Sequence, residues 1–122
     1  MANYLKERFR SFKFAFQGIA TLMKQTPNAR IHLLAAVIAV LSGFILKIST
    51  PEWLAVVIAI GMVLSLEAVN SSIEMLADMV NSSKDDRIEK IKDLSAAAVL
   101  IGAVAALAIG LVVFLPKIIE LF

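Results

Sequence analysis

The segment Trp53–Val80, WLAVVIAIGMVLSLEAVNSSIEMLADMV, decides the fold of this 122-residue chain. Its first half is apolar, as expected of a helix that crosses a bilayer, whereas its second half carries acids and an amide. Because they recur at helical spacing, five polar residues lie on one helix face: Glu67, Asn70, Ser71, Glu74 and Asp78. A charged side chain inside a membrane helix costs about 2.5 to 3.5 kcal/mol on insertion scales, so this polar face indicates a functional site.

The composition is that of a small integral membrane protein. Hydrophobic residues make up 60% of the chain, and the mean hydropathy is +0.86, whereas an ordinary soluble domain is about 45 to 50% apolar. The chain has no Cys and a single His, His32, which excludes disulfides, thiolate metal sites and Cys nucleophiles. A net charge of +2 is too small to indicate nucleic-acid binding.

Three apolar segments predict an all-α membrane protein that forms a single domain over residues 1–122. The predicted transmembrane helices cover about residues 31–46, 53–80 and 94–115. The last turns of the second helix are expected to leave the hydrocarbon core. Residues 81–93 carry eight charged side chains and are interpreted as a connection outside the lipid.

Residues of about 3–24 predict an amphipathic amino-terminal helix at the membrane surface. Apolar side chains recur at intervals of three and four, and basic side chains lie between them. The apolar positions are Leu5, Phe9, Phe12, Phe16, Ile19 and Met23. The alternative interpretation is a helix packed against the rest of the protein.

The distribution of Lys and Arg predicts the orientation in the membrane. Six of these residues precede the first span, one lies in the first loop, four lie in the second loop and one follows the third span. Because basic flanks stay on the inner side, the amino terminus, the second loop and the end of the 53–80 helix are expected in the cytoplasm. The polar face is then within reach of cytosolic nucleotides.

Small residues at four-residue spacing predict close helix packing and self-association. They occur at Ala98, Gly102, Ala106 and Gly110 in the third span, and at Ala35, Ala39 and Gly43 in the first. The alternative is that Ala and Gly are simply common in membrane helices.

The polar residues supply the parts that phosphoryl transfer needs. Glu67 and Glu74 lie two helical turns apart, so the deeper acid suits a general base and the shallower one suits a divalent cation. Asn70 can contact a carboxylate or a phosphate, and Lys92 and Asp93 offer an ammonium group and an acid that positions it. The chain lacks a Walker motif and a kinase-type Gly-rich loop.

From the residues alone, three interpretations stay open. The first is an ATP-using phosphotransferase. The second is a small oligomeric ion or proton channel, which would also place acids within the membrane but would not need Lys92 or ATP. The third is a structural subunit whose polar residues only hold helices together.

The motif narrows these interpretations. The segment Glu67–Asp78, EAVNSSIEMLAD, is followed after a charged loop by Ile91–Gly102, IKDLSAAAVLIG, and preceded by Pro27–Leu34, PNARIHLL. Together they resemble the prokaryotic diacylglycerol kinase family over essentially the whole chain. The resemblance implies three membrane spans with an amphipathic amino-terminal helix, a homotrimer with active sites between subunits, and a bacterial inner (cytoplasmic) membrane location.

The resemblance also implies roles for individual residues. Glu67 would be the catalytic base that activates a lipid hydroxyl, and Glu74 would ligate the Mg²⁺ that bridges the phosphates of ATP. The residues that would contact nucleotide or phosphate are Asn70, Glu74, Lys92 and Asp93. Asn28 and Arg30, together with His32, would lie near the lipid substrate or the nucleotide.

The implied reaction converts diacylglycerol to phosphatidic acid, with undecaprenol as the alternative acceptor. Family members usually carry a Glu in the metal site at the position that corresponds to Thr26. A neutral hydroxyl is a poorer magnesium ligand, so we expect weaker metal binding here unless Glu7 or Asp78 compensates.

Overall fold

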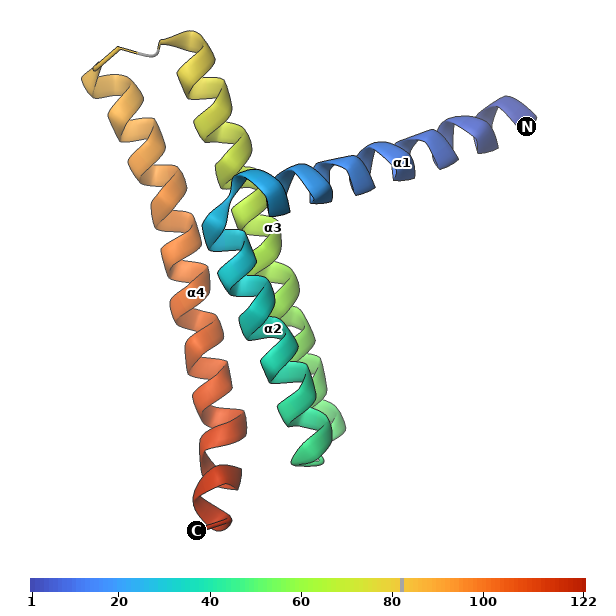
Figure 1. Ribbon diagram of the computed structural model, residues 1–122, viewed down its shortest axis with the longest axis vertical. Coiled ribbons are helices and arrows are strands. Elements are labelled where there is room, and N and C mark those ends of the chain that lie inside the picture. Colours follow the sequence, from blue (N-terminus) through green and yellow to red (C-terminus); the bar gives the residue numbers. More distant parts are fainter. Residues whose placement is uncertain (82) are drawn as a thin grey trace.

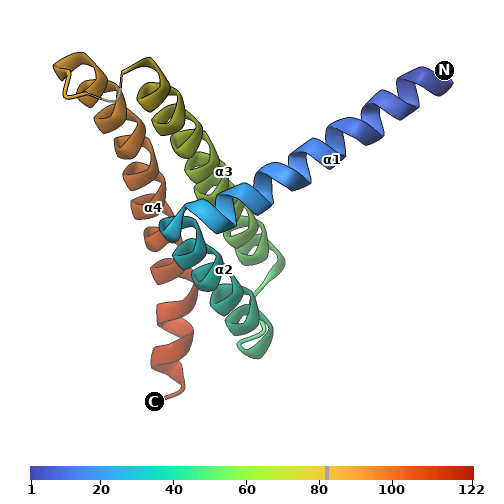
Figure 2. The same cartoon turned by 45° about the horizontal axis from the view of Figure 1, so that its top comes forward.

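The computed structural model describes residues 1–81 and 83–122, and this part of the chain forms four helices. They are α1 (Ala2–Gln25), α2 (Pro27–Ile45), α3 (Thr50–Val80) and α4 (Asp86–Glu120). α2, α3 and α4 run alongside one another, whereas α1 projects sideways and carries the amino terminus away from the bundle (Figure 1 and Figure 2). Three helices, α2 to α4, are long and apolar enough to cross a membrane. The all-helical class with three candidate spans is confirmed.

The turn between α2 and α3 fixes where the polar face begins. Lys47 has a φ of 53°, which reverses the chain within a few residues. Ser49 then caps α3: its hydroxyl accepts a hydrogen bond from the backbone N–H of Glu52, and its own N–H donates to the Glu52 side chain at 2.9 Å. This capping box starts a helix that continues without interruption to Val80, so Glu67 and Glu74 are held by one rigid element.

The start of α4 corrects one expectation. The charge pattern predicts a connection over residues 81–93, but the helix already begins at Asp86; Ser82 lies outside the described residues. The side chain of Asp85 accepts a hydrogen bond from the backbone N–H of Arg87 at 2.8 Å, and acidic residues fill the first turn. These charges favour a helix start rather than a loop. The early start places Lys92 on α4, well inside the helix.

A narrow stripe on α3 forms part of the buried core, to which Ile48 and Val113 also belong. Val56, Ala59 and Val63 are buried at helical spacing, and Glu67 is the next residue in that series. Gly43 of α2 makes room for the ring of Trp53 on α3, because a Cβ at Gly43 would lie 2.7 Å from that ring. Most large apolar side chains outside this stripe are exposed, which is the expected surface of a chain that contacts lipid or other subunits.

Candidate active site

Glu67 occupies a core position although it is an acid. It is the largest side chain that the described residues bury completely, with 1% of its surface exposed. Its Oε1 lies 3.2 Å from Nε2 of His32 on α2. The distance suits a hydrogen bond but the direction does not, and neither carboxylate oxygen has a hydrogen-bond partner within residues 1–81 and 83–122. A buried carboxylate with unpaired oxygens is costly as a structural element and is typical of an acid held for chemistry.

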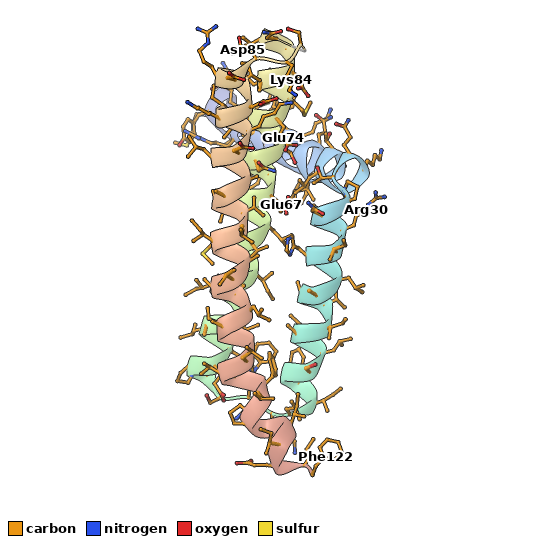
Figure 3. All side chains as sticks on the ribbon, turned by 90° about the vertical axis from the view of Figure 1, so that its left-hand side faces the viewer. Arg30, Glu67, Glu74, Lys84, Asp85 and Phe122 are labelled. Atoms are coloured by element: carbon orange, nitrogen blue, oxygen red, sulfur yellow. The ribbon has the colours of Figure 1, made fainter. Side chains whose placement is uncertain are left out.

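Glu74 and Asp78 lie further along α3, toward the turn that carries Lys84 and Asp85 (Figure 3). Lys92 of α4 donates a short hydrogen bond to the carboxylate of Asp78. Lys92 precedes the apolar part of α4. Its hydrogen bond to Asp78 raises the pKa of its ammonium group, and the negative charges of Asp78 and Glu74 add to this effect. Lys92 therefore stays positively charged at neutral pH, beside two carboxylates.

Asn70 links α3 to α4. Its Oδ1 accepts a hydrogen bond of 2.7 Å from the hydroxyl of Ser95, which is buried. The bond fixes the orientation of the amide and leaves its NH₂ group as a donor toward a ligand. Sequence reasoning missed Ser95, whose only signal was its place three residues after Lys92 on the same helix.

A second link joins α3 to the junction between α1 and α2. The hydroxyls of Thr26 and Ser71 are 2.9 Å apart and share a hydrogen bond. They lie beside a cavity of about 460 Å³ between α1 and α3, which Glu74 and Asp78 also line. We call it the α1–α3 cavity. Four hydroxyl side chains, of Thr21, Thr26, Ser71 and Ser72, line it together with the two carboxylates, and these groups are hard oxygen ligands.

An apolar groove of about 500 Å³ lies between α2, α3 and α4. Small and branched apolar residues form its walls, including Ala35, Ala39, Val56, Val63, Ala106 and Gly110. His32 also lines the groove, so its imidazole lies between the groove and the carboxylate of Glu67. Glu67 thus reaches the apolar groove through its contact with His32, whereas the lining of the polar α1–α3 cavity begins with the next residue of α3, Ala68.

Three predicted site residues are not brought into these contacts. Two of them, Asn28 and Arg30, lie in the first turn of α2. The third, Asp93, lies on α4, and all three side chains are exposed. Their side chains form no hydrogen bond or ion pair with any residue that the structure describes. The predicted polar face is also divided among neighbours, because Glu67 contacts α2, Asn70 contacts α4, and Ser71 contacts Thr26.

The acids at the α1–α3 cavity fit a magnesium ion that is held mainly by phosphates. No group of three or more acidic or His side chains gathers at metal-binding distance in the described part of the chain. Glu74 is exposed and free of ion pairs among these residues, whereas Asp78 is paired with Lys92. Mg²⁺ commonly takes one or two carboxylates and completes its shell with phosphate oxygens and water, which this donor set allows.

Comparisons with known proteins identify the family of this chain. Residues 13–114 match the family described as prokaryotic diacylglycerol kinase. The chain is 35% identical over 115 residues to an undecaprenol kinase of Bacillus subtilis, covering 94% of each chain. It is 28% identical over 112 residues to a diacylglycerol kinase of Synechocystis, covering 91% of this chain and 64% of that relative. This protein therefore belongs to the prokaryotic diacylglycerol kinase family of ATP-dependent membrane lipid kinases.

Proposed function

We propose that the lipid acceptor of this kinase is a polyprenol of the undecaprenol type rather than diacylglycerol, which the sequence had favoured. The observation that carries this proposal is the higher identity to the undecaprenol kinase, 35% over 94% of both chains, against 28% to the diacylglycerol kinase, of which 64% is covered. The groove beside Glu67 is consistent with it, because its walls are almost entirely apolar and offer little to a glycerol backbone.

In the proposed reaction, Glu67 is the general base. Its carboxylate takes the proton of the lipid hydroxyl while that oxygen attacks the γ-phosphorus of ATP. The new bond joins the lipid oxygen to phosphorus, the bond from the γ-phosphorus to the bridging oxygen breaks, and ADP leaves with that electron pair. Burial of Glu67 supports this role, since a site without water protects the phosphoryl group from hydrolysis.

The nucleotide is proposed to bind at the α1–α3 cavity. Glu74 would hold Mg²⁺, which neutralises phosphate charge when bound. The ammonium of Lys92 and the NH₂ group of Asn70 would contact phosphate oxygens, and Asp93 would help to orient this end of α4. Thr26 and Ser71 supply hydroxyls to the same cavity. Asn28 and Arg30 are proposed to contact the lipid head or the nucleotide.

Placement in the bilayer and assembly are also proposals. α1 leaves the bundle sideways at the start of α2 (Figure 1), as expected of a helix that lies on a membrane surface. Beyond this surface, α3 and α4 would extend into the cytoplasm with Glu74 and Lys92.

We propose a homotrimer in the bacterial cytoplasmic membrane. The exposed apolar surface supports an assembly in which a neighbouring subunit completes the site, as do Arg30 and Asp93, which are exposed and pair with no residue that the structure describes.

An acceptor panel tests the proposed substrate. Purified protein in mixed micelles receives γ-labelled ATP and equal mole fractions of undecaprenol, diacylglycerol or a long-chain primary alcohol, and label is counted in the lipid extract. The proposal expects undecaprenol to give at least about a tenfold higher kcat/KM than diacylglycerol, a difference of about 1.4 kcal/mol. Preference for diacylglycerol would overturn it. Ion flux in liposomes without any lipid labelling would instead favour a channel.

A further inference from the structure

We propose that His32 is a positioning residue for the catalytic base, holding Glu67 Oε1 through the N–H of Nε2 so that Oε2 faces the lipid hydroxyl. This inference rests on the proposed function, because it assigns His32 a task in the reaction of Glu67. It begins from the 3.2 Å distance between His32 Nε2 and Glu67 Oε1.

Burial makes this contact significant. Glu67 is 1% exposed and both its oxygens lack hydrogen bonds in the described ranges, so an adjacent donor is the one group that can relieve the cost of an ionised carboxylate there. His32 Nε2 lies within hydrogen-bond distance of Oε1, at 3.2 Å. Catalytic hydrogen bonds are often poorly aligned in a free enzyme and tighten when the substrate binds.

The position of His32 connects the base to the acceptor. Its imidazole is 27% exposed and lines the apolar groove, of which it is the polar end nearest to Glu67. A lipid alcohol that lies along the groove with its hydroxyl at Glu67 must pass this ring. His32 therefore both orients the carboxylate and limits where the hydroxyl can stop.

The two oxygens of Glu67 then have separate tasks. Oε1 accepts from His32, which fixes the rotation of the carboxylate, and Oε2 is left to accept the proton of the substrate. A carboxylate that rotates freely would present the proton-accepting lone pair to the lipid oxygen for only part of the time. Displacing a catalytic group by about 1 Å can cost about a hundredfold in rate.

Three substitutions separate positioning from packing. Gln places its amide nitrogen at about the distance of Nε2 from the backbone, Asn places it near Nδ1, and Leu provides no donor. With the acceptor that the panel selects, H32L and H32N are expected to lower kcat about a hundredfold with the KM for ATP within about twofold of the parent, whereas H32Q regains kcat to within about fivefold. Leu34→Ala, on the exposed side of α2 away from the groove, serves as the control.

Folding is measured on every variant by helical content, detergent size-exclusion and MgATP binding. If H32L folds, binds MgATP and turns over like the parent, the inference is overturned. It is also overturned if H32Q is as slow as H32L, because a packing role depends on shape and not on a donor. If H32L fails to fold, the comparison of H32N with H32Q decides by the same criterion.

Glu67→Gln, assayed in parallel, distinguishes this inference from the proposed function. A slow Glu67→Gln with a fully active H32L would leave Glu67 as the base and remove only His32. A fully active Glu67→Gln would remove the base assignment and the inference with it. Glu67→Asp shortens the side chain by one methylene and so moves the carboxylate away from His32. In this background H32L is expected to lower kcat by less than about threefold. Destabilisation of the fold alone would not give such a non-additive result.

Discussion

The two ends of the helix bundle treat their charged residues differently. At one end, which we call the paired end, Glu52 accepts from the Ser49 backbone and lies 3.1 Å from Nζ of Lys117. We call the other end the open end and define it by Glu67, Glu74, Asp78 and Lys92. Among the described residues, Glu67 is fully buried without a hydrogen bond and Glu74 has no ion pair.

This difference separates structural charges from functional ones. At the paired end the carboxylate of Glu52 is matched by the cap with Ser49 and by Lys117, so the fold itself accounts for these two charges. The open end keeps Glu67 and Glu74 in an unmatched state at some cost in stability, which is expected where strain or unpaired groups serve a reaction. Substitutions at the two ends should therefore change different measurements.

The largest expected effect is at Glu67. Glu67→Gln keeps the shape of the side chain but cannot accept a proton, so turnover should fall by about a hundredfold to ten-thousandfold, the range of general base catalysis. Transfer of label from γ-labelled ATP to lipid measures it. Glu52→Gln, the matched change at the paired end, should keep turnover near that of the parent; an equal loss in both variants would contradict the comparison.

A smaller effect is expected at Glu74. Without its carboxylate the protein contributes less to the metal shell, so Glu74→Gln should raise the Mg²⁺ concentration for half-maximal activity by about tenfold to a hundredfold. The measurement is a magnesium titration at saturating ATP and lipid. An unchanged magnesium requirement would remove Glu74 from the metal site.

Lys92 should act on nucleotide affinity. Lys92→Met keeps the length of the side chain and removes its charge, so the KM for ATP should rise about tenfold, the loss of one charge-assisted contact. Because Asp78 raises the pKa of Lys92, the stability contributed by this pair is present at neutral pH and is lost only as the pH rises through the raised pKa. No loss of activity from Lys92 should therefore appear near neutral pH.

Gly43 tests the paired end through stability. A Cβ there would lie 2.7 Å and 2.9 Å from two ring atoms of Trp53, so Gly43→Ala should destabilise the fold by about 1 to 3 kcal/mol. Thermal unfolding in detergent measures this change. Turnover per folded molecule should stay at the parent value, and a selective loss of kcat with normal stability would show that the two ends are not independent.

Hydropathy was sufficient to predict the helices, and helical spacing was sufficient to place Glu67 and Glu74 on one element. Neither pattern could predict the partners of these acids, because the contact with His32 depends on how α2 and α3 are rotated relative to each other. The start of α4 was misjudged for a simpler reason. A high density of charge is typical of a loop, but Asp85 followed by acids is also a helix start signal.

The central claim is that the open end, and not the paired end, binds MgATP for transfer to a lipid alcohol. Equilibrium binding of MgATP to the intact protein in detergent tests it most directly, with the parent compared with the double variants Glu74→Gln/Lys92→Met and Glu52→Gln/Lys117→Met. We expect binding to be lost in the first double variant and unchanged in the second. Equal affinity in all three proteins would contradict the account.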